Sequence, residues 1–139
     1  ILKESVVRLK MEENVSYMKW VPFTEIPSYI EASDIIVLPF TYDPTTARSL
    51  FESLAMGKPV ITTNMGEVSE ILTDGVHALI VEPEKGEVAA AIIKLIRDLK
   101  LQDKLGKNAQ KLMRTEYSVQ KTARRTVELY DHVLNGKQA

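Results

Sequence analysis

The sequence predicts an α/β fold in which helices cover both faces of a parallel sheet. Four short apolar runs, at residues 15–21, 34–40, 59–63 and 78–81, alternate with segments of helical periodicity. The run IIVLPF has no polar alternation, which is typical of a parallel strand buried on both faces. Alternating strands and helices favour right-handed crossovers. We therefore expect a three-layer α/β/α arrangement.

Composition is that of an ordinary globular domain, with 139 residues, 45% apolar and 27% charged. A net charge of -1 gives no global reason to expect nucleic acid or membrane as a partner. The chain has no cysteine, which excludes disulfides and is compatible with a cytoplasmic location. Residues 1–13 already have helical periodicity, so we expect residues 1–139 to be one partial domain of a longer protein.

Helices are expected between the strands and after the last one. The first covers residues 24–33, with Thr24 as its N-cap, and the next cover residues 45–56 and 67–72. Three further helical stretches follow the last strand, at residues 82–100, 101–116 and 118–134. Ser118 is a good N-cap for the last of these. We expect all three to pack on the sheet.

The helix at residues 45–56 has two different faces. Five apolar residues form one stripe at helical spacing: Ala47, Leu50, Phe51, Leu54 and Ala55. Thr45, Ser49 and Glu52 lie on the opposite side. Gly57 can adopt the left-handed conformation that ends a helix, and the following Lys58-Pro59 prevents its continuation.

This helix begins soon after the run IIVLPF, at the carboxyl end of a strand, where open α/β sheets bind their ligands. Backbone N–H groups at a helix start suit phosphate. Glu52, two turns further on, could accept hydrogen bonds from ribose hydroxyls. The pattern therefore suggests a nucleoside diphosphate, with its phosphates at residues 46–49. The alternative is that Glu52 is a solvated surface residue, as most helical glutamates are.

The segment LFESLAMGKPVITTNMGEVSEILTDGVHALIVEP resembles the donor-binding segment of GT-B glycosyltransferases of the glycosyltransferase family 4 type, in the glycosyl transferases group 1 family. That segment reads roughly E-x-F-G-x-x-x-x-E-A-x-A-x-G-x-P-V, followed by G-x-x-x-E, D-G and a strand ending in proline. The matching residues are Glu52, Ala55, Gly57, Pro59, Val60, Gly66, Glu70, Asp74, Gly75 and Pro83. The upstream VSYMKWVPFTEIPSYIEASDIIVLPF matches the preceding strand, loop, helix and strand.

The resemblance implies an N-terminally truncated, Rossmann-like donor domain that binds a nucleotide diphosphate sugar for retaining transfer to an acceptor hydroxyl. Glu52 would hold the donor ribose, and the base would stack near Trp20 and Val21. The diphosphate would lie against five consecutive residues, Thr45, Thr46, Ala47, Arg48 and Ser49. The donor sugar would lie near a second group of residues, Thr63, Asn64, Gly66 and Glu70. The acceptor, a sugar or lipid, would bind an absent N-terminal domain.

The sequence departs from the family pattern before Glu52. Pro44 stands where the first motif glutamate is expected, and Thr46-Ala47 replaces Phe-Gly. Asp43 could substitute for the glutamate, although an Asp-Pro turn is its simpler role. The family's diphosphate-binding Arg and Lys precede residue 1, so we expect the fragment alone to be inactive.

Other candidate residues have simpler roles. His77 and His132 have no second ligand at metal spacing, so we expect no metal and no cofactor. Phe23, like Trp20, either flanks a base or packs in the core. Five basic residues form a stripe that we interpret as a solvated flank rather than a nucleic-acid or peripheral membrane surface: Lys100, Lys104, Lys107, Lys111 and Arg114.

Several alternatives remain open. The missing glutamate allows a catalytically silent nucleotide-sugar-binding or regulatory domain, and a nucleotide-sugar epimerase shares the GT-B fold. A dinucleotide oxidoreductase is disfavoured because no G-x-G-x-x-G follows a strand. The family places two further strands between those at residues 15–21 and 34–40. We therefore expect one of three outcomes: these two strands pair directly, a second copy pairs there, or the two missing strands lie outside the given residues. We favour the first two together, with self-association in either case.

Overall fold

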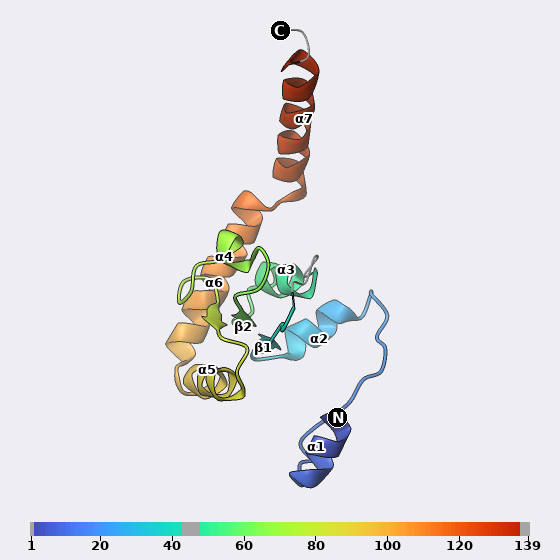
Figure 1. Cartoon of the computed structure of the whole chain (residues 1–139), viewed down its shortest axis with the longest axis vertical. Helices are drawn as coiled ribbons and strands as arrows, with labels where there is room; N and C mark the ends of the chain where they lie inside the picture. The colour runs from blue at the N-terminus through green and yellow to red at the C-terminus, as the bar shows by residue number, and fades with distance from the viewer. Residues whose placement is uncertain (1, 43–47, 137–139) are drawn as a thin grey trace.

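The computed structural model describes residues 2–42 and 48–136. Its centre is a three-stranded parallel sheet of order β1-β2-β3, shown in Figure 1. The strands are β1 (Ile36–Leu38), β2 (Val60–Thr63) and β3 (Leu79–Val81). Ile36 is paired with Val60, and Ile61 is paired with Leu79. The expected parallel α/β sheet is confirmed, with three of the four expected strands.

The helices lie close to where the sequence predicts them. They are α1 (Leu2–Arg8), α2 (Ile26–Ala32), α3 (Arg48–Ala55), α4 (Val68–Ile71), α5 (Lys85–Arg97), α6 (Leu99–Glu116) and α7 (Val119–Asn135). Thr24 is not the N-cap of α2: Glu25 occupies that position without a side-chain cap hydrogen bond. Pro27 in the first turn sets the start of α2 instead, since its fixed φ already suits a helix. Within the described ranges, no helix is both long and apolar enough to cross a membrane.

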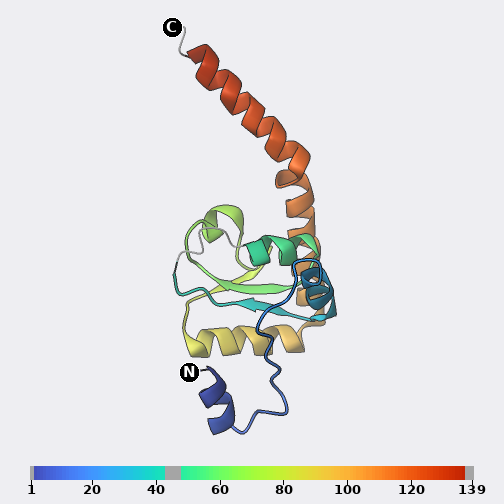
Figure 2. The ribbon, with the colours of Figure 1, turned by 90° about the vertical axis from the view of Figure 1, so that its right-hand side faces the viewer.

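Adjacent residues of β2 point to opposite faces of the sheet and enter separate cores. Val60 packs with Leu54 of α3 and with residues of α4 and the second half of α6. Ile61 packs with Leu95 of α5 and with the first half of α6. Figure 2 shows the sheet lying between α3 on one side and α5 on the other. The three-layer arrangement follows directly from this alternation.

Residues 15–21 do not form the expected strand. The side chains of Tyr17, Met18 and Trp20 are 40%, 56% and 81% exposed. A strand needs a hydrogen-bonded neighbour, and among the described residues β1 is paired only with β2. The expected direct pairing of residues 15–21 with the strand at 34–40 is therefore wrong. As an edge strand, β1 is also half-buried rather than fully buried.

The helix α7 extends away from the sheet, as Figure 1 shows, and none of its described residues is buried. Val119 and Leu134 are 81% and 66% exposed. The expectation that the C-terminal helices pack on the sheet is confirmed for α5 and α6, whose residues enter the two cores. It is wrong for α7, whose main neighbour is the end of α6.

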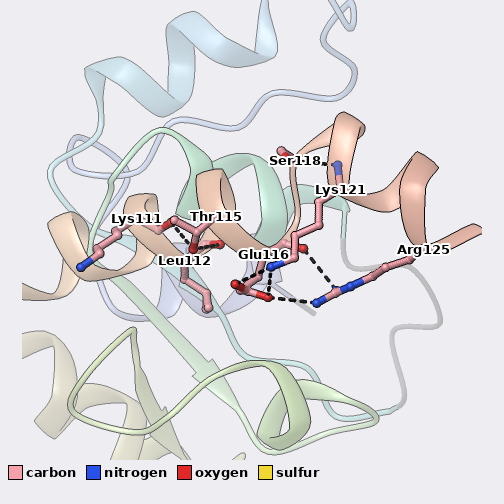
Figure 3. Close-up of polar contacts among 7 residues, drawn as sticks. All are labelled: Lys111, Leu112, Thr115, Glu116, Ser118, Lys121 and Arg125. Atoms are coloured by element: carbon pink, nitrogen blue, oxygen red, sulfur yellow. Dashed lines mark hydrogen bonds and ion pairs between the residues drawn. The ribbon is translucent and has the colours of Figure 1, made fainter. Parts of the chain in front are cut away.

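A cluster of charges lies at the junction of α7 with α6, shown in Figure 3. The Glu116 carboxylate accepts hydrogen bonds from Lys121 Nζ at 2.7 and 2.8 Å and from Arg125 Nη2 at 2.9 Å. The hydrogen bond from Lys121 is the main reason why the pKa of Glu116 is lowered. Ser118 accepts a hydrogen bond from the Lys121 backbone N–H, which confirms it as the N-cap.

Backbone meets backbone where α6 crosses the end of α3. Gly57 ends α3 with φ of +73°, the left-handed conformation expected for it. Gly106 of α6 faces this turn so closely that a Cβ there would overlap the Gly57 carbonyl oxygen. Gln110, one turn later, donates a hydrogen bond from Nε2 to the Ala55 carbonyl at 3.3 Å. The position of α3 is therefore fixed by α6 at this point.

We predict that Gly106→Ala lowers the free energy of unfolding by about 1–3 kcal/mol, because the added methyl group forces α6 away from α3. This loss outweighs the gain of about 1 kcal/mol in helix propensity. Denaturant unfolding measures the difference. Gly86→Ala in α5 is the matched control, because its added Cβ meets nothing within 4 Å. Equal stability of the two variants would contradict the close approach.

Candidate functional site

The buried face of α3 differs by one position from the expected stripe. Leu50 and Leu54 are 1% and 0% exposed, as the stripe predicts. Ala55 is exposed, however, and Ser53 is buried in its place. The Ser53 hydroxyl donates to the Ser49 carbonyl at 2.7 Å, so the helix satisfies this polar group by itself. The opposite face of α3 presents Glu52 and the exposed Ser49.

Glu52 is paired with Arg48, one turn earlier in α3. Arg48 Nε donates to Glu52 Oε1 at 2.7 Å. The Glu52 side chain is 29% exposed and the Arg48 side chain 64%. The guanidinium carbon of Arg48 also lies 3.9 Å from the ring centroid of Phe23, which makes a cation–π contact. Phe23, Arg48 and Glu52 therefore form a continuous group, here called the Arg48 cluster.

The Arg48 cluster joins the two segments to which the sequence assigns the base and the ribose. Phe23 closely follows Trp20 and Val21 in the loop before α2, and Glu52 lies in α3. Val21 is half-buried, and Trp20 is 81% exposed. From the sequence, Phe23 is expected either beside a base or in the core. Its contact with Arg48 could not be predicted, because helical or strand periodicity does not relate residues so far apart in the chain.

The expected diphosphate positions lie mostly outside the described residues. Asp43, Pro44, Thr45, Thr46 and Ala47 all fall in the segment that the structure does not describe. Their expected roles therefore remain predictions. Of the expected diphosphate-binding group, the described members are Arg48 and Ser49, both exposed in the first turn of α3.

The expected donor-sugar residues begin at the last residue of β2, Thr63, at the carboxyl edge of the sheet. Thr63 is buried, and its hydroxyl donates to the Phe40 carbonyl at 2.6 Å, so this side chain holds the ends of β1 and β2 together. Asn64, Gly66 and Glu70 are exposed. These three residues are accessible to a ligand beside α3, whereas the Thr63 side chain is already committed to the scaffold.

The Asp74-Gly75 pair of the family motif has a structural role at the other edge of the sheet. Asp74 Oδ1 accepts a hydrogen bond from the Ile80 N–H at 2.8 Å, and Gly75 N–H donates to the Ala78 carbonyl at 2.9 Å. His77 Nδ1 accepts from the Thr73 N–H at 3.1 Å. These bonds fold the turn that leads into β3. They make no contact with the Arg48 cluster.

The basic stripe on α6 is partly engaged with neighbouring groups. Lys104 Nζ donates to the Gly75 carbonyl at 3.4 Å, and Lys107 pairs with Asp103 at 2.7 Å. Both contacts agree with a solvated flank, and the Lys104 contact also links α6 to the turn before β3. In the described segments, no three histidine or acidic side chains gather as a metal site would require.

A shallow cavity of about 210 Å³ lies beside β3, on the side of the sheet covered by α5. Its charged lining residues are Asp74, Glu87 and Lys94. None of its lining residues is among those that the sequence predicts to bind the nucleotide sugar. This cavity is therefore the alternative location against which the Arg48 cluster has to be tested.

The glycosyl transferases group 1 family model matches residues 2–112, which is most of the chain. The chain belongs to this family. YtcC of Bacillus subtilis (strain 168) is 28% identical over 131 residues, which cover 93% of this chain and 32% of YtcC. The chain therefore spans about a third of the length of this relative.

Solved structures show the same fold. The C-terminal domain of LpcC, a glycosyl transferase group 1 family protein of Francisella tularensis, has a TM-score of 0.76 and 28% identity. The alignment covers 85% of this chain and 61% of that one. HepE of Anabaena, in complex with UDP, has a TM-score of 0.87 at 24% identity, over 94% of this chain and 35% of HepE. The Rossmann-like fold class expected from the sequence is confirmed.

We predict that His77 makes the fold less stable as the pH falls below about 6.5, the ordinary imidazole pKa. Partial burial lowers the pKa of His77, and only its neutral ring accepts the Thr73 N–H. The unfolded chain therefore binds a proton first, so its protonation draws the equilibrium toward unfolding. Denaturant unfolding between pH 7 and 5 measures this: the free energy of unfolding should fall less in His77→Gln than in the wild type. His132→Gln is the control for loss of an imidazole. If the free energy of unfolding of His77→Gln fell as steeply with pH as that of the wild type, His77 would not be the source of the pH dependence.

Proposed function

We propose that the chain is the donor-binding half of a retaining GT-B glycosyltransferase of the family 4 type. Its substrate would be a nucleotide diphosphate sugar, and an acceptor hydroxyl would bind a separate domain. Family membership supports transferase chemistry. Because the chain spans about a third of its relatives, transfer itself is proposed for the longer protein that would contain it.

The Arg48 cluster is the observation that carries this proposal. It brings the expected base loop, through Phe23, against the helix that bears the expected ribose residue, Glu52. The expected donor-sugar residues Asn64, Gly66 and Glu70 follow the neighbouring strand. A nucleotide sugar can therefore extend along the carboxyl edge of the sheet, from the loop before α2 past the start of α3 toward α4. HepE, which has this fold, was crystallised with UDP and with UDP-glucose.

In the proposed reaction, the bond between the anomeric carbon and the diphosphate oxygen breaks. The acceptor hydroxyl oxygen forms the new bond on the same face of the sugar, and its proton passes to an oxygen of the leaving diphosphate. The nucleoside diphosphate leaves with the electron pair and gains negative charge. Backbone N–H groups at the start of the helix and the Arg48 guanidinium would stabilise that charge, without a metal or other cofactor.

Two rivals remain, the first because Pro44 stands where the family has a glutamate near the donor sugar and the second because an epimerase shares the GT-B fold. A silent binding domain would bind the nucleotide without transfer, and an epimerase would change the sugar without an acceptor. Transfer of labelled sugar from a panel of UDP, GDP and ADP sugars, using the longest gene product that contains this chain, tests the proposal. A product that joins donor sugar to acceptor supports it. Binding without a product, or an epimerised free donor, would contradict it.

We predict that Glu52→Ala weakens nucleoside diphosphate binding by about 1.5–3 kcal/mol, the range for a hydrogen bond to a charged group. Calorimetry with UDP, GDP and ADP measures this. Stability should change by less than about 1 kcal/mol, because the Arg48–Glu52 pair is partly exposed. Glu128→Ala, in α7, is the matched control for loss of a surface carboxylate. Unchanged affinity in Glu52→Ala would refute the ribose assignment.

A further inference from the structure

Arg48 combines two contacts that an ordinary surface arginine does not need. Its Nε donates to Glu52, and its guanidinium carbon lies 3.9 Å from the ring centroid of Phe23, a residue from a different part of the chain. The Glu52 contact alone would be a common pair of residues four apart on a helix. The Phe23 contact adds a second, independent constraint on the guanidinium. Among the described residues, the two Nη groups have no hydrogen-bond acceptor.

A carboxylate that binds ribose creates an electrostatic problem for a nucleoside diphosphate. The ligand's own negative charges lie within a few ångströms of its ribose, so Glu52 repels them while it binds the hydroxyls. A cation between the two would remove this conflict. Arg48 lies one helical turn before Glu52, on the side of the proposed diphosphate.

We infer that Arg48 bridges the ribose and diphosphate subsites: its Nε stays on Glu52 while its Nη groups bind the diphosphate. This inference rests on the proposed function. It adds that Arg48 is the residue that makes the protein bind a nucleoside diphosphate more tightly than the corresponding nucleoside. A carboxylate has enough lone pairs to accept from Arg48 and from two ribose hydroxyls together. The contact with Phe23 restricts the orientation of the guanidinium, so that its remaining donors do not rotate freely.

The bridge requires arginine in particular. Only a planar guanidinium can stack on an aromatic ring, donate from Nε to one anion and donate from Nη to another. A lysine ammonium is a single point of charge on a flexible stem, so it can neutralise Glu52 or the diphosphate but cannot keep the stacked bridge. Phe23 remains 60% exposed with Arg48 beside it, and the cation–π contact is what ties this ring to α3.

The test compares each nucleoside diphosphate with its own nucleoside. The protein is titrated with UDP, GDP and ADP, and the one that binds is then paired with uridine, guanosine or adenosine. Arg48→Gln should weaken diphosphate binding on the order of tenfold, the loss expected for a charge-assisted hydrogen bond, and leave nucleoside binding nearly unchanged. Arg48→Lys should restore only part of the loss. Arg124→Gln in α7 is the matched control for loss of one surface arginine.

Phe23→Leu provides an independent readout. It should weaken diphosphate binding in the wild-type background and have almost no effect in the Arg48→Gln background, because the ring acts only through Arg48. Equal losses for diphosphate and nucleoside in Arg48→Gln would show that Arg48 merely holds Glu52, and would overturn the bridge. Unchanged affinities would show an ordinary surface pair. If the wild type binds none of the three diphosphates, the proposed function fails before Arg48 is tested.

Discussion

The close contact of α6 with the turn that ends α3 is the constraint on which the rest of the structure depends. Gly106 and Gly57 allow the two backbones to meet, and the Gln110 hydrogen bond to Ala55 holds them there. Because α6 also supplies residues to both cores, it fixes α3 relative to the sheet. The position of Glu52 and Arg48 therefore depends on a contact at the opposite end of their helix.

Local chemistry explains why most of the fold can be predicted from the sequence. The Gly57-Lys58-Pro59 turn specifies both the end of α3 and the start of β2, and the Ser118 cap specifies α7. Residues 15–21 mislead because an apolar run shows that a strand is possible without showing its partner. The orientation of α7 cannot be predicted from the sequence either, because helical periodicity does not show what the apolar face of a helix packs against.

The site is predicted in a similarly uneven way. Spacing alone identifies the outer face of α3, and the resemblance selects Glu52 from that face. The contact between Arg48 and Phe23 is not predictable, because it depends on how the loop before α2 packs against α3, and no local pattern in the sequence specifies that packing. Thr63 is another case: a position that matches a ligand loop carries a side chain that is hydrogen-bonded to the scaffold. Motif matching identifies positions, whereas the use of each side chain depends on its neighbours.

A crystal structure of the protein with UDP, GDP or ADP, whichever binds, would show directly how the nucleotide lies against α3. We predict the ribose hydroxyls on the Glu52 carboxylate, the base beside the loop before α2, and Arg48 still against Phe23 with its Nη groups toward the diphosphate. A nucleotide in the cavity beside Lys94, or one whose ribose lies away from Glu52, would contradict this prediction.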